Sequence, residues 1–131
     1  MPTSSTSQIM GNNECIEPYT ENMYKRTTLA GDFIVVNPYL IKELCDLGLW
    51  NETVENSIKI NNGSVQWIEE SGTTLLTDIK RRYMTAYELP QKLLIEDAAD
   101  RQAFICQSQS LNLHMRDESN IHSIIGMHFL S

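Results

Sequence analysis

The pattern of apolar and polar residues predicts a chain made mostly of helices. Asn37-Pro38 can open a helix, because Asn caps helix N-termini and Pro suits the first helical position. Gly48 suits the end of this helix. A second helix is expected over residues 52–60, before the turn residues Asn61-Asn62-Gly63. The apolar stripe of the first helix consists of Leu40, Ile41, Leu44 and Leu47.

Strand patterns are fewer than helical ones. Residues 23–36 read MYKRTTLAGDFIVV, which predicts two short strands joined around Ala30-Gly31-Asp32. Residues 110–115, SLNLHM, alternate apolar and polar side chains. This alternation predicts a half-buried strand, or a barrel strand with one polar face. Residues 11–22 are rich in Gly, Asn, Pro and Glu, so they are expected to form an ordered loop.

The longest helical pattern covers residues 78–103, and Pro90 interrupts it. A proline inside a helix removes a hydrogen bond and costs roughly 3 kcal/mol, so we expect two helices or a kink at Leu89-Pro90. Before this pattern, residues 64–78 should hold a short helix or an irregular turn around Trp67. Residues 119–130 return to helical spacing. The apolar positions of the long pattern are Ile79, Tyr83, Ala86, Leu93, Leu94 and Ala98.

A cluster of hydroxyl residues stands at the start of the chain, in the sequence PTSSTSQI over residues 2–9. Residues 5–10 can form a short helix that this cluster opens. The hydroxyls then have two interpretations. They can simply cap the helix, or they can join the free N–H groups and the helix dipole in holding an anion. The spacing of the residues alone leaves both open, with capping the simpler.

Charge and hydropathy exclude two classes of partner. The net charge is −7 and the longest basic run is Lys80-Arg81-Arg82, so a nucleic-acid surface is not expected. No apolar stretch approaches the length that crosses a bilayer, so a membrane partner is not expected either. A hydrophobic content of 41% is ordinary for a globular protein.

Cysteine and histidine give no sign of a metal site or a catalytic thiol. The three cysteines are odd in number and far apart, which argues against a disulfide framework and favours a reducing, cytoplasmic location. None forms a C-x-x-C pair, and the histidines lack metal-ligand spacing. The Gln and Ser side chains of residues 107–110 can instead satisfy backbone groups at a helix–strand junction. The residues in question are Cys15, Cys45, Cys106, His114, His122 and His128.

Several segments, in one order, resemble the large subunit of class I ribonucleotide reductase, in its eukaryotic and viral form. Residues 1–26 resemble P-T-A-S-T-x-Q-I-x-G-N-N-E-x-x-E-P, and residues 31–52 resemble G-E-F-x-x-V-N-P-H-L-x-x-D-L-x-x-x-G-L-W. Residues 61–68, NNGSVQWI, match N-G-S-I-Q-x-I. Residues 101–115 are similar to R-G-A-F-I-D-Q-S-Q-S-L-N-I-H, and residues 126–129 match S-M-H-F. The resemblance therefore covers nearly the whole chain.

This resemblance implies a fold and a site. The fold is α/β, as a helix-rich fragment of the large-subunit barrel with few strands, and residues 1–131 form a partial C-terminal barrel domain. The family converts ribonucleoside diphosphates to deoxyribonucleoside diphosphates by radical chemistry. The implied substrate-phosphate-binding residues are Thr3, Ser4, Ser5 and Thr6. The family has Ala at the position of Ser4, a small difference that adds a hydrogen-bond donor.

The family's redox motifs do not occur in this sequence. The N-L-C-x-E motif of the radical cysteine, the C-x-x-C tail and the paired tyrosines after M-H-F are all missing. We therefore expect no catalytic residue and no cofactor in this chain. Cys106 stands where the family usually has Asp, and Pro90 where it usually has Ser. The expected partners are a ribonucleoside diphosphate and the large and small subunits of the reductase.

Two functional hypotheses follow. In the first, the chain is part of a reductase large subunit that contributes the phosphate-binding loop and is inactive alone, because it starts on a helix cap and stops inside an apolar helix. In the second, it is a non-catalytic, degenerate relative that binds a reductase subunit or has no function. In either case we expect a marginal or molten fold when the chain is alone, since a strand at residues 110–115 would expose a sheet edge.

Overall fold

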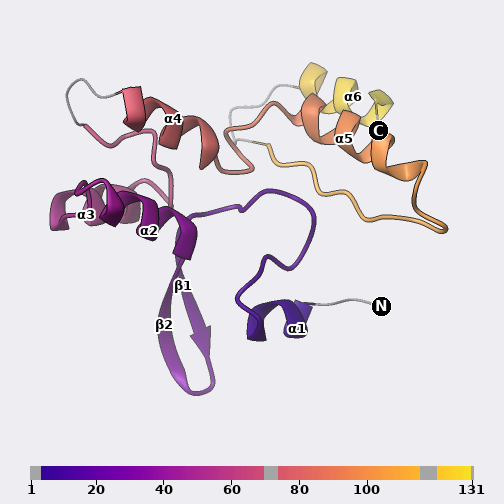
Figure 1. Cartoon of the computed structure of the whole chain (residues 1–131). Helices are drawn as coiled ribbons and strands as arrows, with labels where there is room; N and C mark the ends of the chain where they lie inside the picture. The colour runs from indigo at the N-terminus through magenta and orange to yellow at the C-terminus, as the bar shows by residue number, and fades with distance from the viewer. Residues whose placement is uncertain (1–3, 70–73, 116–120, 131) are drawn as a thin grey trace. The chain divides into compact units, whose positions relative to one another are not determined.

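The computed structural model describes residues 4–69, 74–115 and 121–130. The chain divides into two compact units, one of residues Tyr19–Thr85 and one that combines Met1–Pro18 with Ala86–Ser131. The described residues form six helices and one two-stranded sheet, which does not close on itself (Figure 1). None of the helices in these ranges has the length and hydropathy that a membrane-spanning helix needs.

The unit Tyr19–Thr85 contains a β-hairpin, as the sequence predicts. Strand β1 covers Met23–Thr28, strand β2 covers Gly31–Val36, and the two are antiparallel. Gly31 has a φ of +128°, a conformation that few residues other than glycine adopt, so it suits the tight turn. Met23 is buried at the base of the hairpin. The rest of the hairpin projects from the helices of this unit (Figure 1).

Two helices follow the hairpin, and both have the expected bounds and an asparagine cap. Helix α2 covers Pro38–Asp46, and the Asn37 side chain accepts hydrogen bonds from backbone N–H groups in its first turn. Helix α3 covers Glu52–Ile60, and Asn51 caps it with a hydrogen bond of 2.8 Å. Local capping residues thus fix where both helices begin.

The apolar faces of these elements meet in one core. Leu44 and Ile58 have no exposed surface, and Ile79 is 1% exposed. Helix α4, Thr74–Arg82, closes the core and begins four residues earlier than the predicted start at residue 78. The expected irregular turn around Trp67 is present, and this side chain is 66% exposed. The core residues are Met23, Leu40, Leu44, Val54, Ile58, Val65, Ile68, Leu76 and Ile79.

A buried amide connects the segments around this core. Asn22 is 3% exposed, and its side-chain nitrogen donates to the carbonyl oxygens of Gly63 at 3.1 Å and Tyr83 at 2.8 Å. Its side-chain oxygen accepts a hydrogen bond of 3.1 Å from the Asn37 side chain. The Gly63 carbonyl oxygen also accepts from the backbone N–H of Asn22 at 3.3 Å. Hydrogen bonds of this kind satisfy polar groups that are removed from water. Asn22 therefore joins the base of the hairpin to the start of α2 and to the ends of α3 and α4.

The second unit contains helices α1, Ser4–Ile9, and α5, Gln91–Gln102. The pattern over residues 78–103 forms two helices, as predicted, and Pro90 directly precedes the second. The first, α4, already ends at Arg82, so the interruption is longer than the predicted break at Leu89-Pro90. The Gln91 side chain donates to the carbonyl oxygens of Ala86 at 2.8 Å and Leu89 at 3.0 Å. Helix α5 buries Leu94, Ile95 and Ala98, but not the predicted core residue Leu93, which is 44% exposed.

Helix α6, Ile121–Leu130, confirms the helical pattern near the end of the chain. It lies beside α5 (Figure 1). Its apolar side chains are nevertheless mostly exposed, among them Ile121 at 66% and Phe129 at 83%. Exposed apolar area of this extent is typical of surfaces that contact another part of a protein.

The predicted strand at residues 110–115 is wrong. In the structure this segment is irregular and has no strand beside it in the described ranges. Part of the alternation persists, because Leu111 and Leu113 are half-buried while Asn112 is exposed. Side chains take the place of a partner strand: Glu17 accepts from the backbone N–H of Asn112 at 2.7 Å, and Gln91 accepts from that of His114 at 2.6 Å.

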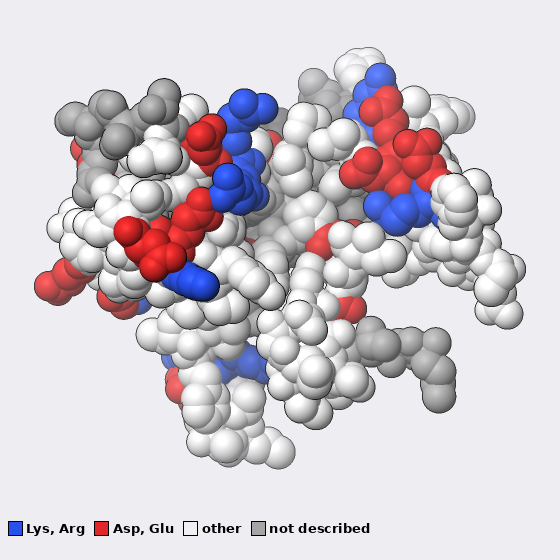
Figure 2. All heavy atoms as spheres, viewed as in Figure 1, with Lys and Arg blue, Asp and Glu red and all other residues white. Residues whose placement is uncertain are grey.

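Acidic and basic side chains lie close together on the face shown in Figure 2, both over α5 and over the helices of the other unit. Two ion pairs lie within single helices, between Lys59 and Glu55 in α3 and between Lys92 and Glu96 in α5. Exposed pairs of this kind contribute little to stability. Their mixing agrees with the absence of a basic stripe in the sequence.

Candidate functional site

The hydroxyl cluster lies at the first turn of α1. The helix begins at Ser4, and the side chains of Ser5 and Thr6 are exposed. The first backbone N–H groups of any α-helix have no partner within the helix, so they are free to bind an acceptor. Thr3 lies outside the described residues. Ser4, Ser5 and Thr6 are thus the first three residues of this short helix.

The other end of α1 is closed by backbone hydrogen bonds. The backbone N–H of Met10 donates to the carbonyl oxygen of Thr6 at 3.1 Å, and that of Asn12 donates to the carbonyl oxygen of Ser7 at 2.9 Å. Gly11 has a φ of +71°, the left-handed conformation in which glycine commonly ends a helix. Residues 5–10 were predicted to form a short helix, and this is confirmed within one residue at each end.

The loop after α1 is held by Glu17. The carbonyl oxygen of Glu17 accepts a hydrogen bond of 2.6 Å from the Asn13 side chain. Its carboxylate oxygens accept from Asn112, one from the backbone N–H at 2.7 Å and one from the side-chain amide at 2.9 Å. These two residues are 95 positions apart, so no local sequence pattern predicts the contact.

The segment that carries Asn112 is itself attached to α5. Gln109 donates to the carbonyl oxygen of Ala98 at 2.5 Å, and the backbone N–H of His114 donates to Gln91. The imidazole of His114 also lies edge-on to the Tyr87 ring, with ring centres 5.0 Å apart. The prediction that the glutamines after α5 satisfy backbone groups is confirmed at Gln109.

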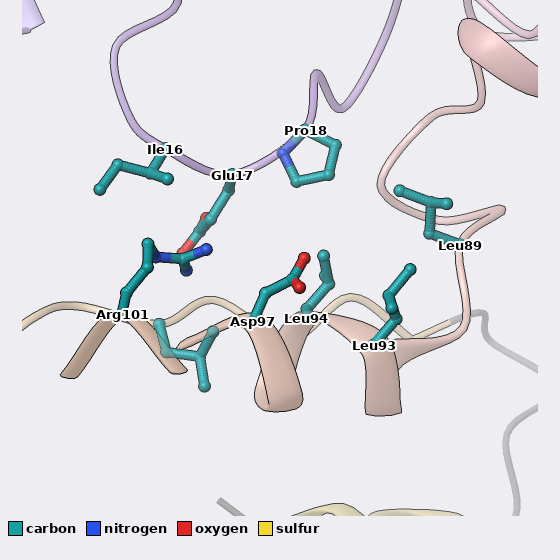
Figure 3. Close-up of a pocket in the computed structure, with 9 residues that line it drawn as sticks. Ile16, Glu17, Pro18, Leu89, Leu93, Leu94, Asp97 and Arg101 are labelled. Carbon is teal, nitrogen blue, oxygen red and sulfur yellow. The ribbon is translucent and has the colours of Figure 1, made fainter. Parts of the chain in front are cut away.

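A small cavity of about 120 Å³ lies between the loop after α1 and helix α5. Figure 3 shows the Glu17 carboxylate and the Arg101 guanidinium pointing toward one another, with Asp97 beside them. Leucines form much of the remaining lining. Pockets for drug-sized ligands occupy about 300–1,000 Å³, so this cavity is too small for a nucleotide. Its two carboxylates also disfavour an anion.

The cysteines and histidines belong to no metal-binding cluster in the part of the chain that the structure describes. Among the described residues, no group of three or more His, Cys, Asp or Glu side chains is placed to hold a metal ion. Cys15, Cys45 and Cys106 are free and exposed. The resemblance assigns none of these groups to the phosphate-binding segment.

The clearest pKa shift is that of Tyr83, in the unit Tyr19–Thr85. The hydroxyl of Tyr83 donates to the Glu43 carboxylate at 2.7 Å, and Arg82 pairs with the same carboxylate. Burial, together with the bond to Glu43, raises the pKa of Tyr83 to about 12. The bond from Tyr83 in turn lowers the pKa of Glu43. These groups connect α2 to the end of α4, which is a structural role.

The family model described as "Ribonucleotide reductase, barrel domain" matches residues 1–131. The chain belongs to this family. The match covers both compact units, and the helix-rich fold with an unclosed sheet is consistent with an incomplete piece of the ribonucleotide reductase barrel.

Relatives of the family are similar along almost the whole chain. The ribonucleoside-diphosphate reductase large chain of Neurospora crassa is 52% identical over 129 residues, which are 98% of this chain and 13% of that protein. The large subunit of monkeypox virus is 51% identical over 129 residues, or 16% of its length. The class Id ribonucleotide reductase alpha subunit of Actinobacillus ureae superimposes with a TM-score of 0.76 at 30% identity, covering 98% of this chain and 23% of that one. The chain thus spans less than a quarter of each of these proteins.

Proposed function

We propose that this chain is part of the large subunit of a ribonucleoside-diphosphate reductase, and that it contributes the segment that holds the substrate diphosphate. The observation that carries this proposal is the family match over residues 1–131, together with relatives named as reductase large subunits. The phosphate-binding residues are Thr3, Ser4, Ser5 and Thr6, which resemble the family's segment at this place.

The chemistry of this segment suits a diphosphate. Hydroxyl and backbone N–H groups donate hydrogen bonds to phosphate oxygens, and the positive end of the helix dipole favours the negative charge. All of these donors are neutral, and the chain carries a net charge of −7. Binding therefore depends on positioned hydrogen bonds rather than on net attraction, which allows the diphosphate to leave after reaction. Ser4 adds one hydroxyl to this set.

Catalysis requires sequence beyond these residues. The chain corresponds to 13% of the Neurospora crassa relative and 16% of the monkeypox virus relative. The redox motifs of the family are missing from the sequence, so reduction depends on the remainder of the large subunit and on a small subunit. Neither a nucleic acid nor a membrane takes part in this function, and the cytoplasm is its location.

A binding measurement on the 131-residue chain tests the phosphate-binding proposal. Cytidine diphosphate and inorganic pyrophosphate are titrated into the ¹⁵N-labelled chain while the backbone amide signals of Ser5 and Thr6 are followed. We expect shifts at these amides, with weak affinity in about the millimolar range. The double variant Ser5→Ala/Thr6→Val should remove most of the response, and Ser7→Ala, a matched hydroxyl in the same helix, should retain it. Equal responses in all variants would refute the assignment.

A second candidate function is association with a reductase subunit without catalysis. The exposed apolar residues of α6 favour it, because they present a surface that another protein can cover. This chain alone, mixed with a competent small subunit, should not reduce cytidine diphosphate in either case, so complementation of a large subunit separates the two candidates. A chain that restores activity to a large subunit lacking this segment supports the first candidate, and one that binds the intact enzyme without effect supports the second.

A further inference from the structure

Glu17 connects two parts of its unit that are remote in sequence. Its carboxylate accepts two hydrogen bonds from Asn112, at 2.7 Å and 2.9 Å. One comes from the backbone and one from the side chain, so the pair fixes the direction as well as the distance of the contact. Glu17 ends the loop that begins at α1, and Asn112 lies in the segment that follows α5.

On the α1 side, the contact is transmitted through a short, bonded loop. The Asn13 side chain donates to the carbonyl oxygen of Glu17, and the next backbone N–H, that of Glu14, donates to the Asn13 side chain. The backbone N–H of Asn12 donates to the carbonyl oxygen of Ser7, which belongs to α1. Apolar burial contributes little at the neighbouring position, because Ile16 is 70% exposed. Polar contacts therefore set the course of this loop.

On the α5 side, Asn112 is held from both directions along the chain. Before Asn112 in the chain, the Gln109 side chain donates to the Ala98 carbonyl oxygen. After it, the backbone N–H of His114 donates to the Gln91 side chain. Ala98 is 6% exposed and belongs to the buried face of α5. The two bonds to Glu17 thus connect the loop, and through it α1, to α5, the helix of this unit with the most buried residues.

We propose that Glu17 is a positioning residue for the diphosphate segment: its paired hydrogen bonds to Asn112 hold α1 and its hydroxyl cluster in place relative to α5. The inference rests on the proposed function of residues 3–6, but the contact itself can be tested separately. We assign Glu17 no contact with the substrate. It acts by fixing the orientation of Ser5 and Thr6, because donors that bind a diphosphate must be held in one geometry.

The chemistry of the pair allows a reciprocal test. Asn112→Asp replaces the amide with a second carboxylate, which repels Glu17 and removes one of the two donors. Glu17→Gln alone should keep both hydrogen bonds, since the Asn112 amide can rotate to accept from the new amide nitrogen. It also removes the negative charge that faces Arg101, as the double variant does, so the two variants compare the hydrogen bonds alone. In the double variant Glu17→Gln/Asn112→Asp, the glutamine oxygen accepts from the backbone N–H and its nitrogen donates to the aspartate. Both hydrogen bonds and the net charge are then restored. Gln107→Glu, at an exposed position of the same segment, is the control for added charge.

The experiment measures pyrophosphate and cytidine diphosphate affinity together with ¹⁵N order parameters of Ser5, Thr6 and Ala98 in the 131-residue chain. We expect Asn112→Asp to weaken binding about tenfold and to lower the order parameters of Ser5 and Thr6 from a rigid value near 0.85 to below about 0.6, with Ala98 unchanged. The double variant should recover both properties, and Gln107→Glu should leave both as in the wild type.

Each remaining outcome has a defined meaning. Wild-type order parameters at Ser5 and Thr6 in Asn112→Asp would overturn the proposal. If the unaltered chain binds neither probe, the proposed function fails, and the order parameters alone then decide whether Glu17 positions α1. If Asn112→Asp also loosens Ala98, the double variant decides: recovery of Ser5 and Thr6 supports the paired contact, and lack of recovery overturns it.

Discussion

Ile58 and Ile60 offer a test of where the stability of the chain resides. Both isoleucines belong to α3, two positions apart, but Ile58 has no exposed surface whereas Ile60 is 79% exposed. Ile58 is part of the core of the unit Tyr19–Thr85. The variants Ile58→Ala and Ile60→Ala make the same chemical change in the same helix. Their difference therefore reports burial rather than helix propensity.

The expected magnitude follows from the atoms removed. Ile58→Ala deletes three buried carbon atoms, and each buried CH₂ contributes about 0.8 kcal/mol, so the lost transfer energy is about 2.4 kcal/mol. A cavity adds to this loss, because a packed core collapses only partly, and substitutions of this type cost about 2–5 kcal/mol in total. A unit of this size has a total stability of only about 3–10 kcal/mol. Ile58→Ala should thus remove a large part of it, while Ile60→Ala should cost less than about 0.5 kcal/mol.

Urea unfolding followed by far-ultraviolet circular dichroism measures both variants against the unaltered chain. We expect Ile58→Ala to lower the free energy of unfolding by about 3 kcal/mol more than Ile60→Ala does. Two variants that agree within about 0.5 kcal/mol would refute the assignment of the core. A gradual transition in the unaltered chain would instead match the marginal or molten fold that the sequence predicts, and would contradict a well-packed core.

Three further predictions concern the same unit. Gly63→Ala should destabilise the chain far more than Gly48→Ala. Both glycines have positive φ, but an added Cβ at Gly63 would lie 2.6 Å from the backbone nitrogen of Asn22, whereas Gly48 faces open space. Equal melting temperatures of the two variants would contradict this. Asn22→Ala removes the side-chain donor to the Tyr83 carbonyl oxygen and one of the two donors to that of Gly63, and should cost about 2–4 kcal/mol in urea unfolding. A loss below about 0.5 kcal/mol would show that the amide is not needed. Tyr83 should titrate near pH 12, because burial and its bond to Glu43 raise its pKa above the ordinary 10. Because the pKa of Tyr83 is higher in the folded chain than in the unfolded chain, its contribution to stability is complete below about pH 10 and is lost as the pH rises toward 12. The difference between ultraviolet titrations of the unaltered chain and of Tyr83→Phe gives the pKa of this tyrosine. A difference centred near pH 10 would disprove the prediction.

Local signals in the sequence predicted most of the helices. Asn37-Pro38 marks the start of α2 because capping depends only on neighbouring backbone groups, and the turn residues after Ile60 mark the end of α3 in the same way. Pro90 marks the start of α5 for an equally local reason, whereas the pattern did not predict that α4 ends at Arg82. The strand at residues 110–115 failed because strand formation depends on a partner that alternation cannot identify. Here the partners are the side chains of Glu17 and Gln91.

The candidate site was accessible to sequence reasoning only in part. Spacing located the hydroxyl cluster and the short helix, but it could not separate capping from anion binding. The resemblance supplied the phosphate-binding interpretation, and the family match supports the context in which that interpretation applies. No local sequence pattern indicated the contact between Glu17 and Asn112, since it joins a loop residue to an irregular segment 95 positions away.

Transplantation into a complete large subunit tests whether this segment holds the substrate diphosphate. The 129 matched residues of the Neurospora crassa large chain are replaced by those of this chain, and reduction of cytidine diphosphate is measured with the corresponding small subunit. We expect turnover, and a rise in KM of about tenfold with a smaller change in kcat when Ser5→Ala/Thr6→Val is added. A transplanted subunit that folds like its parent but does not turn over, or a KM that the double variant leaves unchanged, would contradict the claim that this segment holds the substrate diphosphate.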